Sequence, residues 1–190
     1  MNSTGTYGFE YYFDVAGLLR VIMITPVQPV NGVKHYFKLG SPEYNWFSKV
    51  VDSARQAGIA WIVVGMHAIC LSVGSYGCFD KTTLGEDGMN LMVAKKVDLI
   101  LQGHDHNYQR SRQLSLGSGC TKIFGDPDDG SSYSTNSACV ADDGLDNRYI
   151  KGSGAVFVIA ATSGNASYAV SGADREAGYF ARYATGSEGY

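Results

Sequence analysis

Short apolar runs alternate with polar, glycine-rich stretches along most of this 190-residue chain. Runs at residues 10–13 and 20–25 surround the turn Asp-Val-Ala-Gly and predict two strands. The second of them, Arg-Val-Ile-Met-Ile-Thr, is apolar enough that we expect it to be buried on both faces. Further runs at 59–65, 97–103 and 155–162 also have the length and composition of buried strands.

Helical spacing replaces this pattern in two places. Ser41 and Pro42 form a typical helix start, apolar residues then recur every three or four positions, and Gly58 predicts the end. A weaker helical pattern covers residues 84–96, between the runs at 59–65 and 97–103. A strand, a helix and a strand in this order form a βαβ unit, whose strands are parallel neighbours. The sequence therefore predicts an α/β fold.

Three of the four histidines follow the two strands of this unit. His67 comes just after the first strand, and His104 and His106 follow the second. Because the carboxyl ends of parallel strands share one edge of a sheet, we expect these imidazoles to converge there. Imidazole is a common metal ligand, and three of them with one water would form a zinc site. Asp105 would point the opposite way and accept a backbone hydrogen bond in the turn. The alternative is that these histidines are ordinary hydrogen-bonded loop residues.

The composition narrows the class of protein. Hydrophobic residues make up 45% of the chain, which is enough for a sizeable core. Charged residues make up 17%, the formal net charge is −3, and no block of Lys and Arg occurs, so we expect neither nucleic-acid binding nor attachment to an anionic membrane. The longest apolar runs are of strand length, which argues against a membrane span. The first ten residues lack the pattern of a signal peptide.

Four cysteines occur at suggestive spacings. Three pairings are possible, and we favour Cys70 with Cys78 and Cys120 with Cys139. Together with 24 glycines and 13 tyrosines, these pairs favour an extracellular or otherwise secreted parent protein. The alternative is four free thiols in a cytosolic protein.

Residues 115–152 are polar and show no periodicity, which predicts an insertion loop in a single domain over residues 1–190. Five aspartates lie between Cys120 and Cys139 or shortly after Cys139: Asp126, Asp128, Asp129, Asp142 and Asp143. Such a cluster can bind Ca²⁺, but the spacing matches no EF-hand loop, so we expect a solvated acidic loop.

Three stretches resemble one known family. The string GHDH in QGHDHNYQRS is similar to the Gly-His-x-His block of the calcineurin-like metallophosphoesterases, especially their purple-acid-phosphatase-like branch. GMHAIC resembles the isolated-histidine block of that branch, and YYFDVAGLLRVIMIT resembles the preceding strand pair. The resemblance covers about Tyr7 to Leu114 and Gly154 to Phe180. It implies the C-terminal portion of a four-layer α/β/β/α sandwich, in which the βαβ unit carries the histidine loops.

The resemblance also implies a function and a set of site residues. Members hydrolyse phosphate esters with two divalent or mixed-valence metal ions, of Fe, Zn or Mn. The family pattern assigns His67 and His104 to one ion and His106 to the other. Tyr108 and Arg110 would line the phosphate side of the pocket. For Arg110, a salt bridge or another surface role is the alternative.

The chain also departs from the family pattern. No GD-x-x-Y or GNH string occurs, so the aspartate that bridges the metals and a further histidine are missing. We therefore expect an incomplete domain whose missing N-terminal half is its main partner, alongside a small phosphate-ester substrate. One alternative is an inactive fragment that binds at most one metal ion. Another is a secreted binding module, which the 12% aromatic content would suit.

Overall fold

The computed structural model describes residues 3–78, 83–123 and 135–185, and its centre is one eight-stranded mixed sheet. In spatial order the strands are β1 (Thr4–Gly5), β2 (Tyr11–Val15), β3 (Leu19–Met23), β6 (Trp61–Gly65), β7 (Leu99–Gln102), β11 (Val156–Ala160), β8 (Tyr108–Ser111) and β12 (Phe180–Ala184). The four strands β3, β6, β7 and β11 run parallel, and the others pair antiparallel. The predicted α/β class and the parallel βαβ strands are confirmed.

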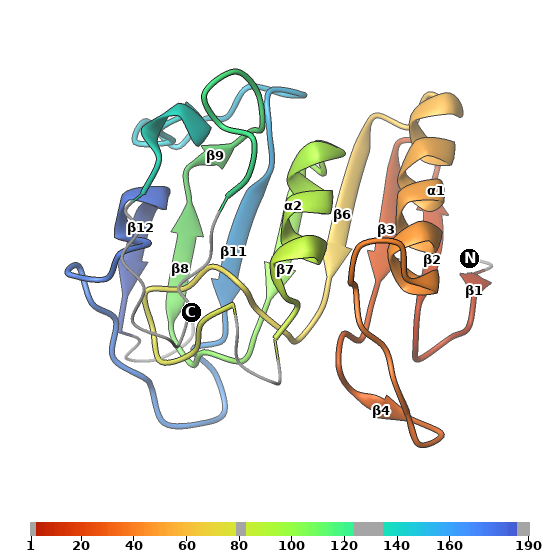
Figure 1. Ribbon diagram of the computed structural model, residues 1–190, viewed down its shortest axis with the longest axis horizontal. Coiled ribbons are helices and arrows are strands. Elements are labelled where there is room, and N and C mark those ends of the chain that lie inside the picture. The colour runs from red at the N-terminus through yellow and green to blue at the C-terminus, as the bar shows by residue number, and fades with distance from the viewer. Residues whose placement is uncertain (1–2, 79–82, 124–134, 186–190) are drawn as a thin grey trace.

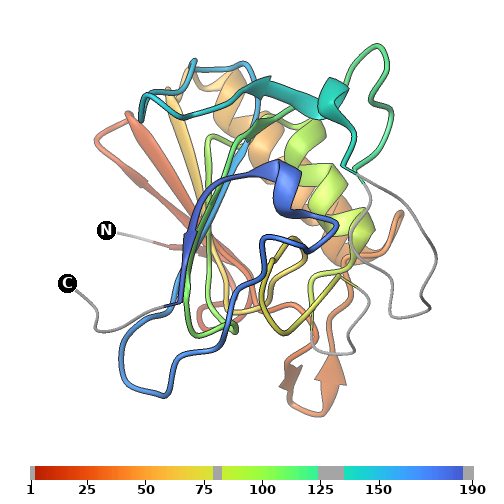
Figure 2. The same ribbon diagram turned by 90° about the vertical axis from the view of Figure 1, so that its left-hand side faces the viewer.

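Helices α1 (Pro42–Gln56) and α2 (Glu86–Ala94) lie on the same face of the sheet (Figures 1 and 2). The predicted cap of α1 is present, because the Ser41 hydroxyl accepts a hydrogen bond from the Tyr44 N–H at 3.1 Å. Gly58, just beyond the helix, has a φ of +74°, a left-handed conformation that glycine adopts readily. The local sequence therefore sets both ends of this helix.

The two faces of the sheet differ in how deeply their side chains are buried. Toward the helices, Ile22, Ile62 and Ile100 are fully buried. On the opposite face, Trp61 and Leu101 remain 42% and 41% exposed. In residues 20–25, positions 20, 22 and 24 are buried whereas 21, 23 and 25 are only partly buried, so the expectation that this strand is buried on both faces is wrong. The reason is that, among the described residues, no helix covers the second face (Figure 2).

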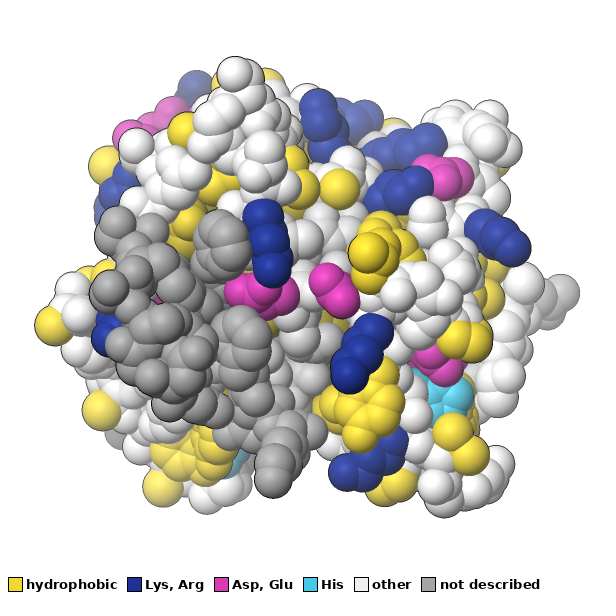
Figure 3. Space-filling view, in the orientation of Figure 1, with side chains coloured by type: hydrophobic (Ala, Val, Ile, Leu, Met, Phe, Trp, Pro, Cys, Tyr) yellow, Lys and Arg dark blue, Asp and Glu magenta, His cyan; other side chains and the backbone are white. Residues whose placement is uncertain are grey.

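The uncovered face is apolar and hollowed. A groove of about 550 Å³ crosses it. Its lining includes Leu19, Trp61, Leu99, Arg110, Tyr149 and Val158. The helix-covered side presents instead charged side chains of both signs to solvent (Figure 3). The open face therefore exposes apolar side chains of the kind that usually lie in a core.

Several short elements were not predicted. They are the hairpin β4 (Pro29–Val30) and β5 (Val33–Lys34), the pair β9 (Gln113–Leu114) and β10 (Val140–Asp142), and the 3₁₀ helices Ser137–Cys139 and Ala177–Tyr179. Strands β8 and β12 were also missed, although they complete one side of the main sheet. In its described residues, 115–123 and 135–152, the predicted insertion contains one strand and one 3₁₀ helix.

The acidic residues of this segment fall into two groups. Asp126, Asp128 and Asp129 lie outside the described residues. Asp142 accepts a hydrogen bond from the Gly144 N–H at 2.8 Å, and Asp143 accepts one from the Leu145 N–H at 2.9 Å. These bonds are the local turns that aspartate commonly makes.

Both predicted disulfides are present, and they join Cys70 to Cys78 and Cys120 to Cys139. All four cysteines are buried. Within the described ranges, no helix combines the length and the apolar character needed to cross a bilayer.

Candidate metal centre

The carboxyl ends of β6 and β7 bring two of the candidate histidines together. The loops after these parallel strands are joined by a backbone bond from the Gly103 N–H to the His67 carbonyl, at 3.2 Å. The His67 Nε2 lies 3.1 Å from the His104 Nδ1. The expected convergence of the two strand ends is therefore observed for this pair.

The spacing of these two nitrogens has a chemical consequence. A hydrogen bond between two imidazoles requires one ring nitrogen to donate and the other to accept, so at least one of the rings must be neutral. Two ligands of one tetrahedral zinc ion, with Zn–N bonds of 2.0–2.1 Å, would lie about 3.3 Å apart. His67 and His104 thus have almost the spacing of two nitrogen ligands on a single ion, and both reach the surface.

His106 belongs to the same edge but not to this pair. Its Nδ1 lies 3.1 Å from the Ala166 carbonyl oxygen, and its ring stacks on Tyr168 at a centroid distance of 4.3 Å. Tyr76 connects the histidine pair with the stack of His106 on Tyr168, because its ring centroid lies 4.3 Å from that of His104 and 6.2 Å from that of Tyr168. The five rings therefore form a continuous row along the edge.

The three imidazoles do not form one compact group. In the part of the chain that the structure describes, no three His, Cys, Asp or Glu side chains come close enough together to hold one metal ion. A single ion held by all three histidines therefore finds no support in the geometry. The donor set fits a pair of ligands for one ion and a separate third ligand.

The chain around these histidines alternates strictly. Positions 104, 106, 108 and 110 are partly exposed, whereas 105, 107, 109 and 111 are fully buried. The buried positions hold Asp105, Asn107, Gln109 and Ser111. Asp105 points away from the histidines and accepts a backbone hydrogen bond, as expected, but the donor is Ser75 in the neighbouring loop, at 3.1 Å.

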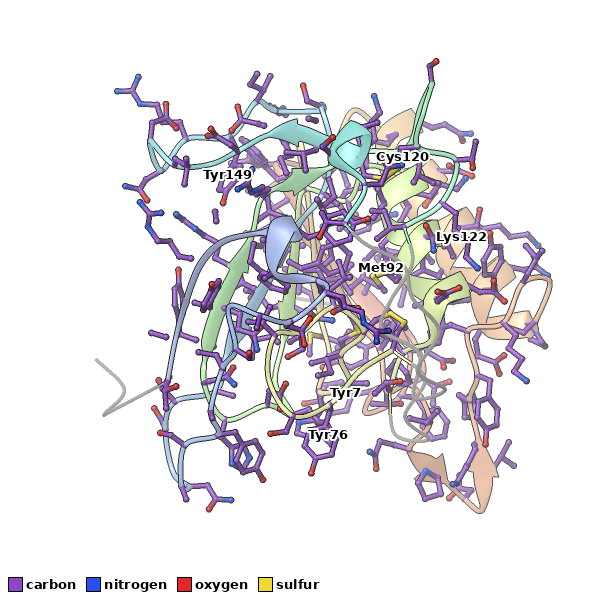
Figure 4. The ribbon with its side chains drawn as sticks, turned by 60° about the vertical axis from the view of Figure 1, so that its left-hand side comes forward. Tyr7, Tyr76, Met92, Cys120, Lys122 and Tyr149 are labelled. Carbon is purple, nitrogen blue, oxygen red and sulfur yellow. A yellow bond between two sulfur atoms is a disulfide. The ribbon has the colours of Figure 1, made fainter. Side chains whose placement is uncertain are left out.

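Arg110 extends away from the imidazoles. Its Nη2 donates to the Asn147 Oδ1 at 2.9 Å, and its guanidinium lies over the ring of Tyr149, 5.6 Å from the centroid. Tyr149 and Tyr76 lie at opposite ends of the molecule in Figure 4. These contacts agree with the alternative surface role of Arg110. Tyr108 is half-buried at the start of β8, and its role in binding substrate stays a prediction.

The fourth histidine lies elsewhere, as expected. The Nδ1 of His35 is 3.2 Å from Glu10 and 3.0 Å from Glu43, so it joins the N-terminal strand region to α1. Burial raises the pKa of the Glu10 carboxyl, the charge of His35 opposes this rise, and Glu43 adds to it. Because His35 lies away from the strand ends, its substitution can serve as a control for substitutions of the histidines there.

Two contributors to the site were not anticipated. Tyr76 and Tyr168 come from irregular segments with no periodic pattern, and their placement depends on the fold. The alternation of 104 to 111 was readable in principle, but its buried residues are polar, and polar residues are normally expected outside.

No protein-family model matches the chain. Purple acid phosphatase 1 of Ipomoea batatas is 28% identical over 80 residues, which are 40% of this chain and 16% of that protein. The Fe(3+)-Zn(2+) purple acid phosphatase 12 of Arabidopsis thaliana is 28% identical over 75 residues, with the same two shares. The chain thus matches about a sixth of the length of these relatives.

The fold has a similar solved counterpart. The purple acid phosphatase PPD1 from yellow lupin (Lupinus luteus) seeds superposes with a TM-score of 0.57 at 16% identity, over 93% of this chain and 26% of that one. The predicted fold class, α/β and a portion of a larger fold such as that of this phosphatase, is confirmed by this likeness.

Proposed function

Because this chain is similar in sequence and in fold to part of the purple acid phosphatases, we propose that it carries the three-histidine portion of a dinuclear metal centre that hydrolyses phosphate esters. His67 and His104 would hold one ion, and His106 would be a ligand of the other. The observation that carries the proposal is the 3.1 Å separation of the His67 and His104 ring nitrogens, with His106 stacked on Tyr168 beside them.

The residues of this chain would orient the ligands. Gly103 leaves room for His67, because a Cβ at position 103 would lie 3.1 Å from the His67 Nδ1. If the Nδ1 of His106 donates to the Ala166 carbonyl, its Nε2 is left available as a ligand. When bound, two ions of this kind would polarise the phosphoryl group and lower the pKa of a water molecule, so that it becomes a nucleophile.

The remaining ligands would come from outside this stretch, because the chain has no aspartate block of the kind that bridges two metals. We propose that the missing N-terminal half of the domain supplies them from a second sheet. The apolar open face, with Trp61 and Leu101 about two-fifths exposed and a groove beside them, supports the packing of such a sheet there.

The test uses the 190-residue chain and compares histidines of different placement. Zinc binding is measured by titration calorimetry, and metal content by elemental analysis after loading with Fe³⁺ and Zn²⁺, the ions named for the Arabidopsis relative. We expect His104→Ala to weaken zinc binding at least about tenfold. His35→Ala, which removes an imidazole away from the strand ends, should leave the affinity unchanged.

Hydrolysis of p-nitrophenyl phosphate is measured on the same samples. Metal-dependent turnover that is lost in His104→Ala would support the hydrolytic part of the proposal. Zinc affinity that is equal in the wild type and in His104→Ala would overturn the ligand assignment. Metal bound by the histidines without any turnover would agree with a chain that carries only part of the ligand set, and would confine hydrolysis to a domain that the outside ligands complete.

A further inference from the structure

Asp105 stands between two proposed metal ligands, yet it points into the protein. Its side chain is completely buried. One carboxylate oxygen accepts the hydroxyl of Ser72, and the other accepts the backbone N–H of Ser75 at 3.1 Å. Both partners lie inside the loop that the Cys70–Cys78 disulfide closes. Asp105 therefore ties the histidine loop after β7 to this disulfide loop.

The contact is tight on the other side as well. A Cβ on Gly74 would come 2.3 Å from the Asp105 Oδ2 and 2.9 Å from the Asn107 Nδ2. Because Gly74 has no side chain, its backbone can approach the carboxylate closely. Ser72 is held in turn, since its hydroxyl oxygen accepts hydrogen bonds from the Gly74 N–H at 2.9 Å and from the Gln109 Nε2 at 2.8 Å. Each oxygen of the carboxylate thus accepts one hydrogen bond, and the Ser72 donor is itself held in place.

The backbone beside Asp105 adopts an unusual conformation. His104 has a φ of +64°, in the left-handed region that residues with a side chain rarely occupy. Such a conformation persists when the surrounding structure holds it, and it is frequent at functional sites. The bonds of Asp105 follow this residue directly, so they are placed to hold the turn.

The disulfide loop also carries a neighbour of the histidine pair. Tyr76 follows Ser75, and its ring lies 4.3 Å from that of His104, which has His67 on another side at 5.1 Å. The bond between Ser75 and Asp105 thus also holds Tyr76, the ring that His104 contacts. We propose that Asp105 is a positioning residue, which clamps the disulfide loop to the histidine loop and so holds the His67 and His104 imidazoles in register. The metal-binding consequence rests on the proposed function, but the placement of the two rings does not.

The experiment compares Asp105→Asn with the wild type in the 190-residue chain. An asparagine can still accept from Ser75, but its amide cannot accept the Ser72 hydroxyl. Proton NMR on histidine-labelled protein reports the contact between the His67 and His104 rings without any metal. Zinc titration of the same samples reports the affinity. We expect the ring contact to be lost and the zinc affinity to fall about tenfold to a hundredfold.

Asp98→Asn is the matched control. Asp98 is also a well-buried aspartate that accepts a backbone hydrogen bond, from Ile62 at 2.8 Å, and it pairs with Arg55 at 2.9 Å. It precedes β7, whereas Asp105 follows it, so it lies at the other end of the strand. Asp98→Asn should lower the melting temperature and leave both the ring contact and the zinc affinity unchanged.

The outcomes separate the two proposals. If Asp105→Asn keeps the ring contact and a zinc affinity within twofold of the wild type, the positioning role is overturned and the proposed function is unaffected. If the wild type binds no zinc, the proposed metal site fails, and the ring contact alone decides the role of Asp105. Should Asp105→Asn fail to fold, Ser72→Ala removes the same hydrogen bond from the other side and is expected to give the same loss of contact.

Discussion

Residues 104–111, called the ribbon below, have a partly exposed side and a fully buried side, and the buried side differs from the buried side of other strands. The partly exposed side has His104, His106, Tyr108 and Arg110, and the fully buried side has Asp105, Asn107, Gln109 and Ser111. In β3 and β6, by contrast, the fully buried positions include Ile22 and Ile62. Here the interior side of the chain is polar throughout.

This difference indicates what the ribbon is for. A buried polar group is no more stabilising than a well-packed apolar one, and it is costly when any bond is lost. A hydrogen-bonded polar network does, however, favour one geometry, because each bond has a direction. The buried side of the ribbon therefore provides orientation, and the exposed side presents the rings that the orientation serves.

The largest expected effect comes from replacing the central residue of the buried side. Gln109 accepts the Val73 N–H at 2.8 Å and donates both to Ser72 at 2.8 Å and to Asn107 at 3.0 Å. Gln109→Leu removes all three of these buried hydrogen bonds and should lower the free energy of unfolding by about 3 kcal/mol. Tyr108→Leu, on the other side of the same strand, should lower it by less than about 1 kcal/mol. Urea denaturation of both variants measures the contrast. Equal losses for the two variants would mean that the two sides do not differ in the way proposed.

A smaller effect is expected from the glycine that allows the carboxylate to approach. Gly74→Ala places a methyl group against Asp105, and overpacking of this kind should cost about 2 kcal/mol. Gly117→Ala is the control, because a Cβ there meets nothing within 4 Å. The cost should shrink when Gly74→Ala is combined with Asp105→Ala, since the clash is then removed. Additive losses in that double variant would show that the close contact is not the cause.

Much of the fold could be predicted because its signals are local. The Ser41 cap, the helix that follows it and the apolar strands flanking the βαβ unit are each encoded by neighbouring residues. Strands β8 and β12 were not predicted, because their burial is set by partners far away in the sequence. Strand β12, for instance, pairs with β8 about 70 residues earlier in the chain. The open face of β3 was likewise not visible, because an apolar strand looks the same whether one face or both are covered.

The candidate site was predictable in part for the same reason. His67 and His104 follow strands, so the meeting of the parallel strand ends brings them together. The role of Asp105 depends on Ser72 and Ser75, which a disulfide loop places beside it. Nothing in the local sequence identifies those partners.

The smallest expected effect tests the exposed side of the ribbon. Tyr168 stacks on His106 at 4.3 Å, with 20° between the ring planes, and its backbone N–H donates to the His106 carbonyl at 2.9 Å. Tyr168→Ala keeps the backbone bond and removes the stacking, so the free energy of unfolding should fall by about 0.5–1 kcal/mol. Tyr168→Phe retains the ring and should match the wild type. Imidazole NMR signals of His106 should broaden or shift in Tyr168→Ala alone, because the ring loses its support while the buried polar side stays intact. A loss as large as that of Gln109→Leu would show that the exposed rings, too, hold the ribbon in place.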